Sequence, residues 1–147
     1  MGLLAGHQHS SHNRYDADKY GVRTVLTIVR NPWDRVISLF HYTQYPGNFV
    51  DFVTHLETKP DRPIFQPCFY WAFGASWVGR YEELDRAYYY LAGQFQRLHF
   101  PRTLPRLHKS DRTSMTLYYR LESGLVDRVG ELYAIDVATF GYEPPRL

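Results

Sequence analysis

The stretch that most constrains the fold runs from residue 24 to residue 42, TVLTIVRNPWDRVISLFHY. Its first six residues form a short, continuous, β-branched run that ends in a turn signal, which predicts a buried strand over 24–29. Asn31 is a good N-cap, and Pro32 suits the first position of a helix. Apolar side chains then recur at helical spacing until a Tyr-Pro-Gly stop at 45–47: Trp33, Val36, Ile37 and Phe40. The stretch therefore predicts a strand-turn-helix unit with two arginines at its turn.

The rest of the chain adds further elements in a recognisable order. A helix over 49–57 with Asn48 as its cap comes first, followed by a second strand over 76–82 and a helix over 83–98. A last helix is predicted over 122–137, with an inward stripe of Leu125, Val129, Leu132 and Tyr133. Two strands joined through helices predict an α/β fold with a small parallel sheet flanked by helices.

Length and charge limit the classes of function that the chain can have. The 147 residues predict one domain, 1–147, and the net charge of +2 does not indicate a nucleic-acid or membrane-surface partner. No apolar run approaches the roughly 18 residues of a membrane span, so a cytoplasmic location is the default expectation. The single cysteine, Cys68, stands among apolar residues and excludes an intrachain disulfide, which predicts a buried thiol.

The predicted turn has the chemistry of an anion site. The first N–H groups of a helix lack partners and the helix dipole favours negative charge there. Arg30 ends the strand, where its planar fork can grip a phosphate or sulfate with two parallel hydrogen bonds. Ser38 lies off the apolar stripe and can add one more hydrogen bond. The alternative is that Arg30 pairs with a carboxylate and Ser38 is plain surface, and physics alone leaves both open.

The segment IVRNPWDRVISLFHY closely resembles the 3′-phosphate-binding segment of sulfotransferases that use 3′-phosphoadenosine 5′-phosphosulfate (PAPS). It is most similar to the carbohydrate sulfotransferase branch and its VRNPxxRxxSxYxY pattern. Three later segments also resemble that family, in the same order along the chain: GRYEELDRAYYYL, LPRLHKS and LVDRVGELYAIDVATFGY. The resemblance implies a P-loop-NTPase-like sulfotransferase fold, in which Arg30 and Ser38 hold the 3′-phosphate.

The resemblance also implies a reaction. A sulfuryl group passes from PAPS, acting as a co-substrate without a metal, to a hydroxyl acceptor that is expected to be a carbohydrate. Lys109 and Ser110 fall in a loop that, by resemblance, closes over the phosphates or the adenine. The competing interpretation of this donor-rich segment is a solvated basic loop.

In-line transfer to an alcohol requires a base near the acceptor hydroxyl, and His or Glu is the usual choice. Gly6-His7 resembles the Gly-His of heparan sulfate 2-O-sulfotransferase-like enzymes, which points to His7 as the base. The neighbouring His9 and His12 leave the register open, and a mobile N-terminal tract or a three-histidine metal site are the alternatives. Glu82 and Glu83 are the runner-up carboxylates, with a structural role favoured for both.

One expected part of the family pattern is missing. An IPKTGGTS-like loop should hold the 5′-phosphosulfate, and nothing before His7 matches it. The expectation is a fragment with weak or no activity alone, whose strand over 25–29 has an unpaired apolar edge. Two alternatives follow: a non-catalytic nucleotide-binding remnant, or a partner-binding α/β domain that pairs with an oligomer mate or a complementing N-terminal chain.

Overall fold

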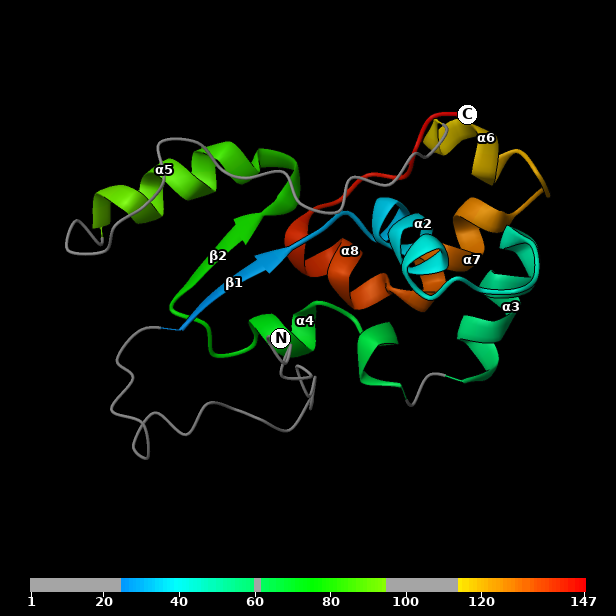
Figure 1. Cartoon of the computed structure of the whole chain (residues 1–147), viewed down its shortest axis with the longest axis horizontal. Helices are drawn as coiled ribbons and strands as arrows, with labels where there is room; N and C mark the ends of the chain where they lie inside the picture. The colour runs from blue at the N-terminus through cyan, green and yellow to red at the C-terminus, as the bar shows by residue number, and fades with distance from the viewer. Residues whose placement is uncertain (1–24, 60–61, 95–113) are drawn as a thin grey trace, which may run out of the picture.

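A computed structural model describes residues 25–59, 62–94 and 114–147 (Figure 1). Two strands, β1 (Leu26–Val29) and β2 (Trp77–Arg80), are accompanied by helices along the rest of these ranges. The α-helices are α2 (Pro32–Tyr42), α3 (Phe49–Thr58), α4 (Phe69–Ala72), α5 (Leu84–Gln94), α6 (Met115–Tyr119), α7 (Leu125–Leu132) and α8 (Ala134–Phe140). Single 3-10 turns lie at Pro63–Phe65 and Tyr81–Glu83.

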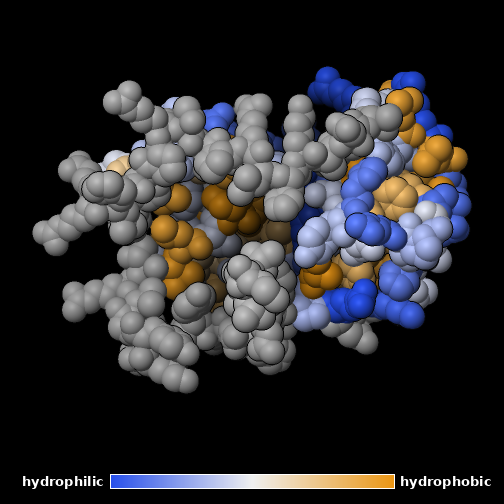
Figure 2. Space-filling view, viewed as in Figure 1, coloured by the Kyte–Doolittle hydropathy of each residue, from blue (hydrophilic) through white to orange (hydrophobic). Residues whose placement is uncertain are grey.

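The two strands form a parallel pair, as predicted. The register runs from Leu26 opposite Trp77 to Val29 opposite Arg80. The prediction that the first strand is buried is wrong for most of its length, because Leu26 and Ile28 are each 39% exposed and only Val29 is fully buried. Within the described ranges the sheet has only two strands, so neighbours cover its faces incompletely. Figure 2 accordingly shows hydrophobic surface over the strands.

The two helices predicted with asparagine caps are both confirmed. The Asn31 side chain accepts the N–H groups of Trp33 at 3.0 Å and of Asp34 at 3.3 Å, which begins α2. The Asn48 side chain accepts the Asp51 N–H at 2.9 Å, which begins α3. Each bond satisfies a donor that a helix cannot pair internally, and this local rule explains why both starts could be read from the sequence.

The hydrophobic core lies where α2, α3 and α7 pack together, beyond the carboxyl ends of the strands (Figure 1). The two apolar faces predicted from the sequence, at residues 33–40 and 125–133, point into it. The buried members from these helices are Trp33, Val36, Ile37, Leu39, Phe49, Phe52, Val53, Leu56, Leu125 and Val129.

The apolar segment that follows Cys68 contains the single-turn helix α4. The buried Asp136 carboxylate accepts the N–H groups of Cys68 and Phe69, each at 2.7 Å, and so caps this turn from α8. Burial raises the pKa of Asp136 while the two N–H groups oppose that shift. The predicted burial of Cys68 is confirmed, and burial also raises the pKa of its thiol.

The predicted single helix over 122–137 is wrong. The chain forms α7 and α8 instead, separated at Tyr133, whose backbone leaves the helical region with φ −115° and ψ 30°. The Tyr133 side chain is buried and its hydroxyl donates to the Phe65 carbonyl at 3.0 Å. These contacts, with the Asp136 cap one turn later, hold the break in place against the local preference for one continuous helix.

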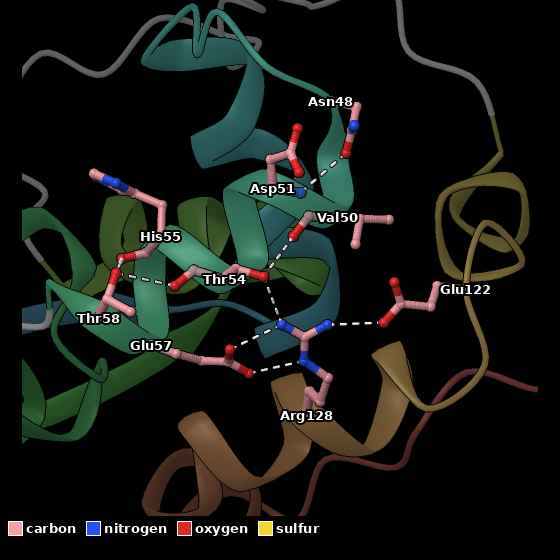
Figure 3. Close-up of polar contacts among 9 residues, drawn as sticks. All are labelled: Asn48, Val50, Asp51, Thr54, His55, Glu57, Thr58, Glu122 and Arg128. Carbon is pink, nitrogen blue, oxygen red and sulfur yellow. Dashed lines mark hydrogen bonds and ion pairs between the residues drawn. The ribbon is translucent and has the colours of Figure 1, made fainter.

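A polar cross-link joins α3 to α7 at the surface (Figure 3). Arg128 donates to both carboxylate oxygens of Glu57, at 2.9 and 2.8 Å, and to the Thr54 hydroxyl at 2.8 Å. Its third nitrogen donates to Glu122 at 2.9 Å. The bidentate geometry orients the two helices as well as attracting them.

Candidate functional site

The candidate site lies at the carboxyl ends of both strands. Because β1 and β2 are parallel, the residues that follow them meet at one edge of the sheet. Arg30 directly follows β1, and the 3-10 turn with Tyr81 and Glu82 directly follows β2. Open α/β sheets bind ligands at this edge, and Arg30 lies there.

Arg30 is the central cation of this edge. Its Nε donates to the Asp34 carboxylate at 2.5 Å, and its guanidinium carbon lies 4.2 Å from the centre of the Tyr81 ring. The side chain is only 15% exposed. Its Nη2 atom is buried and has no hydrogen-bond partner among the described residues. One side of the fork is therefore anchored, while a buried donor that costs free energy when unpaired remains available.

Asp34 is the residue that the sequence interpretation missed. It lies four residues after Arg30 and four before Ser38, so helical spacing places the acid between the two residues assigned to the anion. The observed ion pair is the contact that the structural alternative predicted for Arg30. The signal in the sequence is the acid four residues after the arginine.

The N-terminus of α2 offers fewer donors than the sequence suggested. Asn31 occupies the N–H groups of Trp33 and Asp34, and Pro32 has no N–H. The N–H of Asn31 itself donates to Glu82 Oε1 at 2.6 Å. In this structure, an anion here would depend on side chains rather than on backbone N–H groups.

The other predicted site residues fall into two groups. Ser38 lies on α2, partly exposed, and no residue within the described ranges hydrogen-bonds its hydroxyl. No contact joins Ser38 to Arg30 directly in that part of the chain. His7, Lys109 and Ser110 lie outside the described residues, as do His9 and His12.

Arg35, the second arginine of the turn, points away from the site. Its Nη2 donates to the carbonyls of Ile64 at 2.9 Å and Gln66 at 2.6 Å, and its guanidinium lies 5.3 Å from the Tyr133 ring. These contacts tie α2 to the segment before α4. Arg35 therefore has a structural role in this arrangement.

Of the two runner-up carboxylates, Glu82 belongs to the site and Glu83 does not. Glu82 Oε2 accepts the Tyr142 hydroxyl at 3.3 Å, while Oε1 holds the Asn31 N–H. Burial, and then the Glu82 carboxylate, raise the pKa of Tyr142, so this hydroxyl keeps its proton and donates. Glu83 instead pairs with the exposed Arg86 at 3.2 Å.

No family profile, curated protein or solved structure matches this chain. Among the described residues, no three His, Cys, Asp or Glu side chains gather into a group that could hold a metal ion. Within the same ranges, no helix is both long enough and apolar enough to cross a membrane.

Proposed function

We propose that this chain is a sulfotransferase that moves a sulfuryl group from PAPS to a hydroxyl group, with a carbohydrate as the expected acceptor. Arg30 and Ser38 bind the 3′-phosphate in this proposal. The observation that supports it best is the buried Nη2 of Arg30 at the carboxyl end of β1, which has no hydrogen-bond partner among the described residues. A buried donor without a partner is costly, and a ligand oxygen would satisfy it.

The donors present fit a phosphate. A guanidinium presents paired N–H donors that match two phosphate oxygens. The Ser38 hydroxyl, which no described residue hydrogen-bonds, adds a neutral donor two turns along α2. Tyr81 supports the guanidinium from one face, which limits its rotation. Asp34 is the obstacle, because its carboxylate competes with the ligand for Arg30.

The remaining roles stay predictions on residues outside the described ranges. His7 would accept the proton of the acceptor hydroxyl, and Lys109 with Ser110 would bind the phosphates or the adenine of PAPS. PAPS supplies the activated sulfuryl group. The residues of this chain would orient it, neutralise charge on its phosphates and remove a proton from the acceptor.

A structural role for the junction is the second candidate function, and the Arg30–Asp34 ion pair favours it. In that case the ion pair only fastens the end of β1 to α2, and the Tyr81 ring only fastens it to the turn after β2. The two candidates differ in one measurable property, which is whether a 3′-phosphate on a nucleotide strengthens its binding to the chain.

Isothermal titration calorimetry with adenosine 3′,5′-bisphosphate and adenosine 5′-monophosphate tests this difference. We expect the bisphosphate to bind more tightly to the unmodified chain. Arg30→Ala should reduce the preference for the bisphosphate at least about tenfold, since a charge-assisted hydrogen bond contributes about 1.5–3 kcal/mol. Arg86→Ala is the matched control, because Arg86 is 84% exposed and makes an ion pair only with Glu83 in the described part of the chain.

Comparing the two nucleotides within each variant separates an effect on 3′-phosphate binding from an effect on folding. Arg30→Lys, which keeps the charge but loses the fork, should retain part of the preference, and thermal melting checks that each variant folds. Equal affinity of the unmodified chain for both nucleotides would contradict the proposal. Transfer from radiolabelled PAPS to polysaccharide acceptors then distinguishes an enzyme from a chain that only binds the nucleotide.

A further inference from the structure

Three segments that are far apart in the sequence meet beside Arg30. The Glu82 carboxylate holds the backbone N–H of Asn31 with one oxygen, at 2.6 Å, and the hydroxyl of Tyr142 with the other, at 3.3 Å. Asn31 begins the turn into α2, Glu82 follows β2, and Tyr142 follows α8. One carboxylate therefore joins the entry to α2 with the end of β2 and the C-terminal segment.

Tyr142 is itself held firmly in place. The residue is 7% exposed, and the Arg80 guanidinium lies 5.0 Å from the centre of its ring. Arg80 also donates to the carbonyl of Phe140. Gly141, with φ +62°, takes the left-handed conformation that ends α8 and turns the chain toward β2. The Tyr142 hydroxyl is thus a fixed donor for Glu82.

We propose that Glu82 is a positioning residue for the candidate 3′-phosphate site, with Tyr142 as its buried partner. The inference rests on the proposed function. Arg30 and Asn31 are adjacent in the chain, so the bond from the Asn31 N–H to Glu82 sets where the Arg30 backbone stands relative to β2 and to the Tyr81 ring. Ser38 is carried by the helix that Asn31 begins, so the same bond sets the distance between the two phosphate donors.

Glu82 acts through its neighbours rather than by touching the ligand. Both of its oxygens already accept hydrogen bonds from the protein, and a carboxylate in contact with a phosphate would repel it. Glu82 accepts the backbone N–H of Asn31, and this bond takes no donor from the Arg30 guanidinium. A positioning role therefore depends on the hydrogen-bonding capacity of Glu82, not on its charge.

This distinction makes the inference testable with paired variants. Glu82→Gln keeps an acceptor for the Asn31 N–H and a polar group for Tyr142, whereas Glu82→Ala loses both. The measured quantity is the ratio of the dissociation constants of adenosine 5′-monophosphate and adenosine 3′,5′-bisphosphate. We expect Glu82→Ala to lower this ratio about tenfold and Tyr142→Phe to lower it about threefold. Glu82→Gln should keep it, and Glu83→Ala is the control on the neighbouring exposed carboxylate.

The outcomes separate the inference from the proposed function. If the unmodified chain prefers the bisphosphate and Glu82→Ala keeps that preference, the positioning role is wrong and the proposed function stands. A stronger preference for the bisphosphate in both Glu82 variants would also overturn the positioning role, because Glu82 would then act as a charge that competes with the phosphate. If the unmodified chain shows no preference, the proposed function and the inference fail together. Thermal melting of each variant shows whether a loss of stability accompanies the change in ratio.

Discussion

At the scale of single residues, Asp34 decides how the candidate site behaves. It pairs with Arg30 at 2.5 Å, and it lies between Arg30 and Ser38 at four-residue spacing. A phosphate bound by those two residues would therefore meet a like charge and would have to compete for the guanidinium. The acid also lies in the first turn of α2, where the helix dipole favours it. Stability of the helix and affinity for an anion are thus opposed at this position.

Asp34→Asn should bind adenosine 3′,5′-bisphosphate about fivefold more tightly, because a like charge near 4 Å costs about 1 kcal/mol even in water. The same change should lower the free energy of unfolding by about 0.3–1 kcal/mol through the lost dipole interaction, and further through the lost ion pair with Arg30. Calorimetry measures the first effect and urea denaturation measures the second.

Asp127→Asn is the control for this prediction. Asp127 is an exposed acid in the first turn of α7, so its replacement should cost helix stability without changing nucleotide affinity. An unchanged or weaker affinity in Asp34→Asn would show that Asp34 does not compete with the ligand.

At the scale of elements, β2 depends on a glycine. A Cβ at Gly79 would lie 2.4 Å from Cη2 of Trp77 and 2.8 Å from Cδ1 of Ile28. The Trp77 ring stacks on Tyr90 from α5, with ring centres 5.3 Å apart and planes within 10° of parallel. The indole therefore lies across the position that a side chain at Gly79 would need, and this packing joins α5 to the sheet.

Gly79→Ala should lower the free energy of unfolding by about 1–3 kcal/mol, because overpacking forces the Trp77 ring or the backbone to move. Gly93→Ala is the matched control. Gly93 is an exposed position in α5, and a Cβ there meets no atom within 4 Å, so this variant should gain up to about 1 kcal/mol of helix propensity. Urea denaturation measures both. A Gly79→Ala variant as stable as the unmodified chain would contradict the packing argument.

At the scale of the whole molecule, polar contacts between distant segments complete the fold. One surface example joins α3 and α7 through Arg128, whose hydrogen bond and charge hold the pKa of Glu57 below its ordinary value of 4.5. A lowered pKa in the folded state means that folding is favoured while Glu57 is ionised. The stabilisation is present above pH 4.5 and is lost as the pH falls through the lowered pKa.

Glu57→Gln should therefore be less stable than the unmodified chain at pH 7, by about 0.5 kcal/mol for a partly exposed pair. The difference should shrink toward zero in acid, because the carboxyl of the unmodified chain is then protonated as well. Urea denaturation of both proteins across the pH range measures it, with Glu131→Gln on the exposed side of α7 as the baseline. A difference that is equally large in acid would show that the ion pair is not its source.

The sequence determined the features whose hydrogen bonds and packing are local. Asn31 and Asn48 cap helices whose N–H groups lie two or three residues away, and the buried face of α2 follows from helical periodicity alone. The position of Arg30 at the end of a strand is local in the same sense.

Only the tertiary structure decided the features that depend on partners far along the chain. Asp136 caps α4 across 68 residues, and this long-range bond accompanies the break at Tyr133 that periodicity did not predict. Glu82 lies 51 residues from Asn31 in the chain and accepts its backbone N–H, a donor that the sequence alone suggested for an anion. Local preferences act within about one helical turn, whereas the choice of partner for a buried donor or acceptor is made where the segments pack. For that reason the position of Arg30 at the end of β1 could be predicted, whereas the hydrogen bond from the Asn31 N–H to Glu82 could not.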